Sequence, residues 1–511
     1  MSEKLIPLFK VNMNNNLKIV MNTLTSGMIT QGSKVEEFEN KLKDYFNHPY
    51  ILTLNSATSG LTLAYRLLNL DPNFDKVIST PLTCFATNTA ILANNLNIIW
   101  ADTDKNTCNI DLDDVKKLLD YNTKVLSFVH WGGVPVDLNK VDELKTYAKE
   151  KFNNDLFVIE DCAHSFGSEF NGKKIGTHGN ICVFSLQAIK HLTTGDGGLI
   201  FLPNEELYNR AKLLRWYGID RERRSLPGSD FRLEPDILEY GYKFHMNDIN
   251  ASIGLANFVN IGENINTCYE NGQYYNSNLK NIIGIELFNN DPLSKPSYWI
   301  YTIKILFERK VEFINFMKNK GIVTSQVHAR NDNHSCLIKY KSNLKTLDKI
   351  EKQIVSIPVG WWLKKGDINH ILESIKEFCL SIKIVKLKDD LSKIEEYKKL
   401  LQEMNGYYEE EFKDFNSVDD IYLLINNNKI VSSAKLFIES KIYNPVGHIE
   451  DVVTKTECRR LGYGKYLIKY LIDIGLKNNC YKIILNCKSD LESFYKNCGL
   501  SKTGISFTVY K

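Results

Sequence analysis

The segment from Phe184 to Gly198 carries residue types that could together bind an aldehyde. The apolar run 181–184 is typical of a buried strand, and it is followed by a hydroxyl, Ser185, and then by one lysine, Lys190. A glycine-rich turn, 195–198, comes next. A lysine in a partly dry pocket has a lowered pKa, so it is a free amine near neutral pH and forms a Schiff base with an aldehyde. The alternative is a solvated surface lysine.

An acidic residue, Asp161, stands where another apolar run, 156–159, comes to its end. It could be a plain helix N-cap. It could also be the carboxylate that keeps a pyridine nitrogen protonated, so that the ring acts as an electron sink. With Ser185 for a phosphate and Lys190 for an aldehyde, Asp161 fits one ligand, pyridoxal phosphate.

A run of small and hydroxyl residues, 55–60, opens the expected helix 61–68. Free N–H groups and the helix dipole at such an end attract a phosphate. Taken alone, the run is better explained as an ordinary N-cap.

The elements that must position these residues alternate between strand and helix. Apolar runs predict strands at 50–54, 76–80, 98–102, 125–129, 156–159 and 181–184. Helical spacing or capping predicts helices at 35–46, 61–68 and 142–149 and one that starts at 83–87. Such alternation predicts an α/β fold with a largely parallel sheet whose ligands bind at the carboxyl ends of the strands.

Length and composition bound the remaining possibilities. With 511 residues, the chain has room for two to four domains. A net charge of +3, from 64 basic and 61 acidic residues, gives no reason to expect nucleic acid or a membrane surface as a partner. The 11 cysteines have no disulfide or metal-site spacing, and we see no secretory signal, so we expect reduced thiols in the cytoplasm. No apolar run approaches the roughly 20 residues of a membrane span.

Taken in order, the motifs of the first part resemble the DegT/DnrJ/EryC1/StrS aminotransferases. The resemblance is carried by Gly27, Gly32, 56–58, 160–164, 184–198 and 239–246. It implies the fold of type I pyridoxal-phosphate-dependent transferases, with a mostly parallel αβα sheet and a small C-terminal subdomain, over residues 1–380. It also implies amination of a nucleotide-linked keto-sugar, and homodimers in which the partner subunit closes each active site.

The resemblance assigns roles to individual residues. It makes Lys190 the residue that carries the cofactor, Asp161 the partner of the pyridine nitrogen, and His164 a contact on the side of the ring hydroxyl. Phosphate binding falls to Ala57, Thr58 and Ser185. In this family, members that dehydrate sugars have histidine at the position of Lys190, so the lysine favours transamination with glutamate as the expected donor.

Four positions depart from the family pattern. Ala57 stands where glycine is usual. The aromatic residue that stacks on the cofactor is shifted by one to Phe85, and Trp131 is a second candidate. Lys243 and His245 replace an asparagine and an arginine, and we expect Lys243 to reach the partner's phosphate as a point charge.

Other segments narrow the substrate. The runs 216–221, 327–334 and 357–362 look like those of the branch that aminates C4 of 4-keto-6-deoxy sugars such as dTDP-4-keto-6-deoxyglucose. His328, Arg330 and His334 cluster on one expected loop and could meet sugar or phosphate oxygens, or they could be solvated. Thr30, in the loop 24–32, is a further candidate for substrate binding.

The second part, placed at 381–511, has a different pattern. We expect strands at 382–385, 421–425, 429–438, 448–453 and 482–485, with a hairpin turn at 426–428. A glycine-rich, basic turn, 459–465, opens an amphipathic helix, a setting that suits a pyrophosphate. This order resembles the α+β GNAT N-acetyltransferases, and the blocks 447–451, 480–487 and 494–499 are similar to glucosamine-6-phosphate N-acetyltransferases.

This second resemblance also implies roles. The coenzyme A pyrophosphate would be held by Arg459, Arg460, Gly462, Gly464 and Lys465. Glu450 and Asp451 would bind the sugar and help to take the proton of the amine, and Tyr495 would protonate or steady the leaving thiolate. Tyr495 could instead be a core aromatic. Lys441 could pair with a sugar phosphate or be a surface charge, and Asn486 replaces a family aspartate.

The resulting hypothesis is a bifunctional enzyme of amino-sugar synthesis that uses pyridoxal phosphate and acetyl-CoA and no metal. Its first domain aminates a keto-sugar nucleotide, and its second acetylates an amine, plausibly the new one. One alternative is two independent enzymes on one chain, the second making N-acetylglucosamine 6-phosphate. Another is a non-catalytic regulator that binds pyridoxal phosphate or a sugar.

Overall fold

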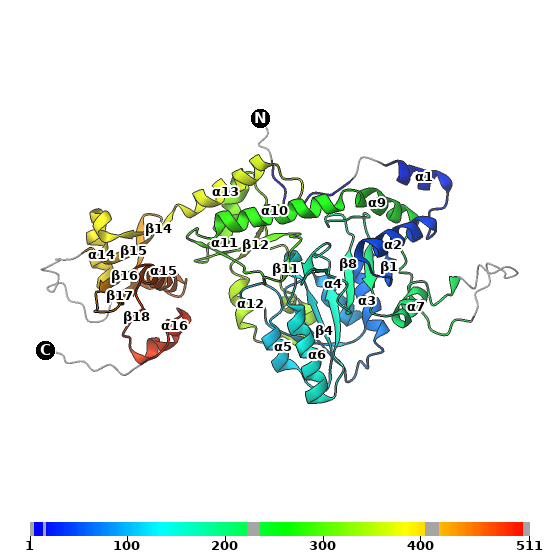
Figure 1. The fold of residues 1–511 in the computed structure, drawn as a ribbon, viewed down its shortest axis with the longest axis horizontal. Coiled ribbons are helices and arrows are strands. Elements are labelled where there is room, and N and C mark those ends of the chain that lie inside the picture. The colour runs from blue at the N-terminus through cyan, green and yellow to red at the C-terminus, as the bar shows by residue number, and fades with distance from the viewer. Residues whose placement is uncertain (1–4, 14–16, 222–235, 404–417, 504–511) are drawn as a thin grey trace. The chain divides into compact units, whose positions relative to one another are not determined.

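The computed structural model describes residues 5–13, 17–221, 236–403 and 418–503 (Figure 1). It divides into two compact units. The first takes Met1–Lys280, Leu287–Lys304 and Ile314–Leu372, and the second takes Asn281–Glu286, Ile305–Phe313 and Glu373–Lys511. Because helix α13 (Lys365–Cys379) is continuous across this division, no linker marks it. Residues 1–380 and 381–511 remain our proposed domain limits. Among the described residues, no helix has both the length and the apolar character of a membrane span.

A seven-stranded sheet, in the order β1-β9-β8-β5-β4-β2-β3, forms the centre of the first unit. Its strands are β1 (Ile51–Leu54), β2 (Lys76–Ser79), β3 (Asn97–Trp100), β4 (Thr123–Val129), β5 (Phe157–Asp161), β8 (Ile181–Ser185) and β9 (Gly198–Phe201). Neighbouring strands are parallel except that β9 runs antiparallel to β1 and β8. The predicted mostly parallel sheet is confirmed, with one reversed strand.

Strand β8 shows why this sheet needs cover on both faces. All of its residues are buried, as expected for a strand inside a parallel sheet. Cys182 and Phe184 belong to one hydrophobic core, whereas Ile181 and Val183 belong to a second one. Since successive side chains point to opposite faces, the two cores are the two sides of the sheet, and the architecture is αβα.

Helices supply the two outer layers of the first unit. They are α1 (Lys18–Ser26), α2 (Ser33–Phe46), α3 (Ala57–Leu67), α4 (Phe85–Ala93), α5 (Leu112–Leu118), α6 (Leu138–Phe152), α7 (Glu205–Leu214), α9 (Asp248–Phe258), α10 (Ile261–Leu279) and α12 (Lys345–Ile350). The shorter strands are β6 (Glu169–Phe170), β7 (Lys173–Lys174), β11 (Ser294–Lys295) and β13 (Ile354–Ile357). Helix α11 (Lys310–Asn319) and strands β10 (Ile285–Leu287) and β12 (Tyr301–Ile305) have residues in both units.

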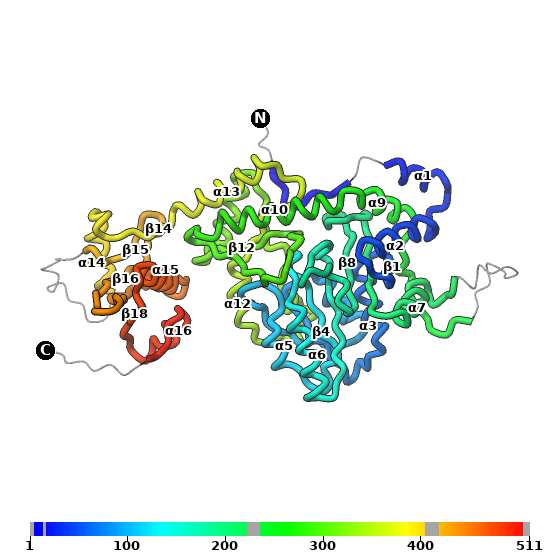
Figure 2. Tube along the Cα trace, in the orientation of Figure 1, coloured from blue at the N-terminus to red at the C-terminus, as the bar shows by residue number. Residues whose placement is uncertain are grey.

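The second unit is built on a five-stranded sheet, drawn in yellow to red in Figure 2. Its strands, in spatial order, are β14 (Ile382–Lys386), β15 (Ile421–Asn426), β16 (Lys429–Glu439), β17 (Val446–Thr454) and β18 (Lys482–Ile484). Its helices are α14 (Ile394–Leu401), α15 (Tyr463–Lys477) and α16 (Glu492–Asn497). The first three strand pairs are antiparallel, and β17 and β18 are parallel.

The hairpin predicted between β15 and β16 is confirmed. Its two loop residues, Asn427 and Asn428, have φ angles of 47° and 61°. Positive φ at both positions is the type I′ geometry that two-residue hairpins prefer, and asparagine tolerates it well.

A buried ion pair ties three elements of the first unit together. Glu39 of α2 accepts hydrogen bonds from Nη1 of Arg215, at 2.6 Å, and from the backbone and side chain of Thr53 in β1, at 2.9 and 2.8 Å. Burial raises the pKa of the Glu39 carboxyl, but the charge and hydrogen bonds of Arg215 outweigh that effect and leave the pKa below its usual value. Arg215 directly follows α7, so this ion pair links α2, β1 and the end of α7.

We expect Arg215→Met to destabilise the first unit by about 3–5 kcal/mol, because it leaves the Glu39 carboxylate buried without a partner. Lys149→Met is the matched control, since Lys149 pairs with Asp155 in solvent at 54% and 74% side-chain exposure; it should change stability by at most about 1 kcal/mol. Tryptophan fluorescence during urea unfolding measures the difference, because all six tryptophans lie in the first unit. Equal midpoints for both variants would contradict the expectation.

Candidate active sites

The carboxylate of Asp161 lies at the carboxyl end of β5, as the sequence predicts. Its side chain is buried; Oδ2 accepts a hydrogen bond from Thr87 Oγ1 at 2.6 Å, and Oδ1 accepts one from the Ala163 N–H at 2.9 Å. Burial raises the pKa of Asp161, and the hydrogen bonds from Thr87 and Ala163 oppose the rise. Thr87 therefore orients this carboxylate, a role that sequence reasoning missed.

Lys190 lies in the turn after β8, where its N–H donates to the Gln187 carbonyl at 2.9 Å. Its Nζ is 3.4 Å from the ring centroid of Trp299. Burial lowers the pKa of Lys190 to about 7, against the opposing negative charge of Asp161. The structure therefore places a reactive amine and a buried carboxylate close enough for their charges to interact, at one edge of the sheet.

His164 and His328 lie side by side in one plane next to this amine. Their rings are inclined by 2° with centroids 5.4 Å apart, and their Nε2 atoms are 3.4 Å from each other. The Gly132 N–H donates to His164 Nδ1 at 3.4 Å, so the hydrogen of a neutral His164 sits on Nε2 and points to His328. Burial, followed by the charge of Lys190, lowers the pKa of both histidines, to about 4 for His328. Both rings are therefore neutral near pH 7.

The backbone that carries His328 is strained. Val327 has φ of 73°, a left-handed conformation that a β-branched residue rarely adopts, and the His328 N–H donates to the Gln326 carbonyl at 3.0 Å across this tight turn. Such strain persists only where the surroundings enforce it, and it is common at functional sites.

The expected phosphate cradle is assembled by a close approach of two backbones. Ser185 is the register partner of Gly198, and a Cβ on Gly198 would lie only 2.4 Å from the carbonyl carbon of Ser56 and 2.5 Å from the nitrogen of Ala57. Only glycine allows this approach, which brings Ser185 towards the N-terminus of α3, where Ala57 and Thr58 form the first turn. The Ser56 hydroxyl accepts the Ser59 N–H at 3.1 Å, and the first helical N–H groups have no acceptor within the helix.

These residues fit pyridoxal phosphate. The fit rests on the chemistry of three groups found together: a half-buried lysine of lowered pKa, Lys190, a buried carboxylate at Asp161, and a helix N-terminus with added hydroxyls at Ser185 and Thr58.

The candidates for stacking on the cofactor differ in their surroundings. Phe85 is the first residue of α4, is 38% exposed, and meets His334 edge-on at 5.2 Å. Trp131 is instead a core residue whose Nε1 donates to Thr302 Oγ1 at 3.1 Å and whose ring meets His164 edge-on. We therefore keep Phe85 as the proposed stacking residue and give up Trp131.

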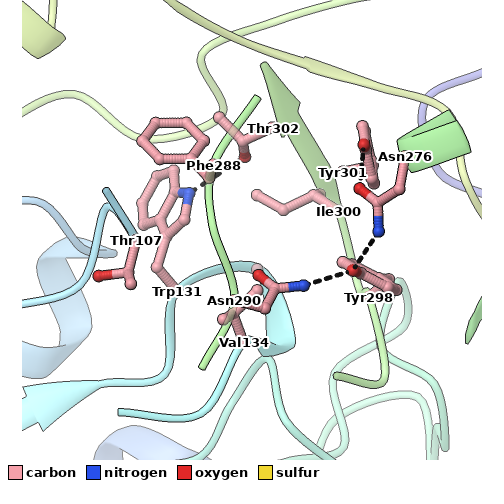
Figure 3. A pocket seen from close by; sticks show the side chains of 11 residues that line it. Thr107, Trp131, Val134, Asn276, Phe288, Asn290, Tyr298, Ile300, Tyr301 and Thr302 are labelled. Atoms are coloured by element: carbon pink, nitrogen blue, oxygen red, sulfur yellow. Dashed lines mark hydrogen bonds between the residues drawn. The ribbon is translucent and has the colours of Figure 1, made fainter. Parts of the chain in front are cut away.

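Trp131 borders a small enclosed cavity, shown in Figure 3. The volume of about 20 Å³ is enough for a single water. Next to it, the Tyr298 hydroxyl accepts hydrogen bonds from Asn290, at 2.6 Å, and Asn276, at 3.4 Å. This cavity is too small for a sugar nucleotide and is not the active site.

Two of the expected substrate and phosphate contacts lie at the surface. Lys243 is exposed, with its carbonyl held by Asn55 Nδ2 at 3.1 Å, and its role stays a prediction. Thr30 is exposed too, and its carbonyl accepts the Asp248 N–H at 3.0 Å.

Arg330, another of the expected substrate contacts, is engaged within the protein. Its Nε and Nη2 bind both oxygens of Asp332 at 2.7 Å, and Nη1 binds Asp348 at 2.5 Å and also pairs with Glu351. The guanidinium is 6% exposed, a substrate would have to compete with three carboxylates, and the role of Arg330 in substrate binding stays a prediction.

One buried cluster, His130, Glu160 and Cys162, brings potential metal-binding atoms within 4.8 Å of one another. However, His130 Nδ1 accepts the Val136 N–H at 3.0 Å, and its Nε2 lies 2.8 Å from Glu160 Oε2. The other carboxylate oxygen of Glu160 accepts a bond from Asn180 at 2.6 Å. Since these lone pairs are used, the cluster serves to fix the backbone next to Asp161.

In the second unit, the basic turn lies directly before α15, where the sequence predicts a pyrophosphate site. Arg460 and Gly462 have φ of 68° and 97°, and Arg459 Nε donates to the Thr454 carbonyl at 3.1 Å. A Cβ on Gly464 would lie 2.7 Å from Thr454 Oγ1, so the helix starts close against β17. Lys465 follows on the exposed side of the first turn.

The remaining candidates lie around the place where β17 and β18 separate. Their parallel pairing ends at His448, whereas β17 continues to Thr454. Glu450 is exposed, and Asp451 has φ of 50° beside an irregularity in the pairing of β16 and β17. Burial raises the pKa of Tyr495, on α16, to about 12. These positions are compatible with the expected roles and do not test them.

Lys441, the expected contact for a sugar phosphate, is exposed at the end of β16. It forms an ion pair with Glu439, which also lies 3.0 Å from His448 Nε2. A substrate phosphate would have to compete with Glu439, and the role of Lys441 stays a prediction.

The lowered pKa of Lys190 has a measurable consequence. In cofactor-free protein, the rate of coloured adduct formation with pyridoxal phosphate should rise with pH and reach half its maximum near pH 7, because only the neutral amine attacks an aldehyde. Absorbance stopped-flow measures this rate, with N-acetyl-lysine amide, of ordinary lysine pKa near 10.4, as the control. A protein midpoint near that of the control would show that the amine is solvated.

Comparisons with known proteins show the family of each part of the chain. The model of the DegT/DnrJ/EryC1/StrS aminotransferase family matches residues 11–376, and that of the acetyltransferase (GNAT) family matches 387–500. AtS13 from Actinomadura melliaura is 40% identical with a TM-score of 0.70, and the match covers 74% of this chain and 100% of that one.

The names of two curated relatives state an enzymatic activity. GDP-perosamine synthase of Escherichia coli O157:H7 is 28% identical over 389 residues, which cover 73% of this chain and 99% of the relative. UDP-4-amino-4,6-dideoxy-N-acetyl-beta-L-altrosamine transaminase of Campylobacter jejuni is 28% identical over 378 residues, which cover 72% of this chain and 96% of the relative. The chain belongs to the DegT/DnrJ/EryC1/StrS aminotransferase family and carries, after this part, a GNAT acetyltransferase domain.

Proposed function

We propose that the first domain transfers an amino group from glutamate to C4 of a nucleotide-linked 4-keto-6-deoxy sugar, such as dTDP-4-keto-6-deoxyglucose. The second domain then acetylates an amino sugar with acetyl-CoA. The observation that carries the first half is the half-buried Lys190, whose amine has a pKa of about 7 and whose charge interacts with that of the buried Asp161 carboxylate.

The chain's own residues divide the work of the first domain. Pyridoxal phosphate, when bound, supplies an electron sink. Asp161, oriented by Thr87, keeps the far side of that ring protonated. Lys190 has a pKa suited to accepting and returning a proton near neutral pH, as general acid-base catalysis requires. Ser185, Thr58 and the start of α3 hold the phosphate.

The names of relatives support the substrate class. One relative is named for a GDP-linked sugar and another for a UDP-linked 4-amino-4,6-dideoxy sugar. Both concern sugars attached to nucleotides, and the second has its amine at C4. His328 presents a neutral ring beside Lys190 and is our candidate to contact the sugar, with His334 and Thr30 further out.

For the second domain, we propose that Arg459, Arg460 and the turn to Lys465 bind the coenzyme A pyrophosphate. Glu450 and Asp451 would receive the amine's proton, and Tyr495, whose pKa is about 12, has its proton available for the thiolate at neutral pH. Because covalent linkage raises the local concentration of the first product, we favour the new amine as the acceptor. Glucosamine 6-phosphate is the alternative acceptor.

We further propose that the protein acts in the cytoplasm as a homodimer, with Lys243 reaching the phosphate site of the partner subunit. A regulator that only binds ligands would have no use for an amine whose pKa is lowered to about 7.

Mass spectrometry of products tests the proposal. The protein is incubated with glutamate and dTDP-, UDP- or GDP-4-keto-6-deoxy sugars, with and without acetyl-CoA, and glucosamine 6-phosphate is offered separately. We expect an amino-sugar nucleotide without acetyl-CoA and its N-acetyl form with it, and neither product from Lys190→Ala.

Two results would contradict parts of this account. If only glucosamine 6-phosphate is acetylated and the amino-sugar nucleotide is not, the two domains act in separate pathways. Loss of keto-sugar without incorporation of nitrogen would indicate a reaction other than transamination.

A further inference from the structure

Trp299 makes the closest aromatic contact of the Lys190 amine. Nζ of Lys190 lies 3.4 Å from the centroid of the indole ring. The same indole donates a hydrogen bond from Nε1 to the carbonyl of Ile189, at 2.9 Å. Trp299 therefore holds both the end of the lysine side chain and the backbone of the residue before it.

The indole itself is fixed from several sides. It is 5% exposed and stacks with His164, at 4.0 Å and 20°, and with Phe9, at 4.9 Å and 23°. The preceding residue, Tyr298, has φ of 47°, and a Cβ on Gly272 would meet its ring at 2.4 Å. A strained, tightly packed backbone position of this kind sets where the next side chain points.

The face of an indole distinguishes the two forms of an amine. It attracts an ammonium group, because the ring quadrupole places negative charge above the plane, and it has no such attraction for the neutral amine. Burial disfavours the charged form of Lys190 and lowers its pKa. A nearby π face stabilises the ammonium and so offsets part of this cost of burial. Unlike a carboxylate, it carries no full negative charge that would raise the pKa strongly and hold the proton on the amine.

The other groups that face Lys190 leave this role open. They are Asp161 at the end of β5, whose charge favours the ammonium, Cys84 before α4, and His164, His191 and His328, whose pKa values are lowered in part by the lysine's charge. His164 Nδ1 already accepts the Gly132 N–H, and His191 Nε2 lies 3.1 Å from the Ser297 carbonyl, so neither of these nitrogens is open to the ammonium. Asp161 is meanwhile engaged by Thr87 and Ala163.

We propose that Trp299 is a positioning residue for Lys190, and that its indole face is the site that receives the side chain when the lysine carries a proton. This proposal rests on the proposed function, in which Lys190 accepts and returns a proton. In that cycle Trp299 keeps the ammonium beside the cofactor ring and stabilises it only weakly, so the proton is easily given back.

Fluorinated tryptophan tests this proposal, because fluorine weakens the negative face of the indole and barely changes its shape. The full chain is produced with tryptophan, 5-fluorotryptophan or 5,6-difluorotryptophan. The same series is made in a Trp299→Phe background, where the other five tryptophans are substituted alike. Reductive methylation of the cofactor-free protein, read by mass spectrometry at the Lys190 peptide, gives the pH midpoint of the amine in each sample.

We expect the midpoint to fall with each fluorine, by roughly 0.3–0.7 pH unit over the series, because the ammonium loses part of its attraction to the ring. In the Trp299→Phe background it should not move along the series. An unchanged midpoint in the wild-type series, or an equal shift in both backgrounds, would overturn the proposal and leave Trp299 as a packing residue.

The adduct with pyridoxal phosphate is measured on the same samples and separates this inference from the proposed function. A wild-type protein that forms no adduct at Lys190 would refute the function, whatever the fluorine series shows. Normal adduct formation with a flat fluorine series would refute only the role of Trp299.

Discussion

The first domain depends on the burial of one amine. Lys190 loses hydration in the site, and that loss lowers its pKa to about 7 against the pull of Asp161. A free carboxylate in contact with Lys190 would have kept the pKa of the amine high. Instead the Asp161 oxygens are bound by Thr87 and Ala163, and the immediate neighbours of Lys190 are a neutral imidazole pair and an indole face. The lowered pKa of Lys190 is thus set by the residues around the amine. These residues belong to segments that are far apart in the sequence.

The scaffold explains how such surroundings are kept dry and fixed. Strands β5 and β8 are neighbours buried on both faces, so Asp161 and Ser185 reach the same edge of the sheet with no freedom to shift in register. Gly198 brings β9 against the start of α3, which gives the phosphate cradle, and the Glu39–Arg215 pair locks β1 and α2 behind it. The His130–Glu160 contact braces the residue before Asp161 from the opposite face. In the second domain, β18 pairs with β17 only as far as His448, and β17 continues to Thr454, beside the glycine-rich start of α15.

Sequence reasoning succeeded where chemistry and local pattern coincide. Lys190, Asp161 and Ser185 each follow an apolar run, and the Asn427–Asn428 hairpin carries its own turn residues. It could not find Thr87 or Trp299, because their roles depend on contacts with residues distant in sequence and their types are common in cores. The ion pair of Arg330 with Asp332 was not foreseen, although Asp332, two residues further on, was a visible sign that the charge of Arg330 is used within the protein. Trp131 was a plausible stacking residue by type, and only its packing against Thr302 shows that it belongs to the core.

The central claim is that one lysine of this chain binds pyridoxal phosphate covalently. The most direct test treats the protein with pyridoxal phosphate and borohydride, digests it, and locates the tagged peptide by mass spectrometry. The account predicts a single tag on Lys190, and its loss in Lys190→Ala with the fold intact. A tag on another lysine, or no tag at all, would contradict it.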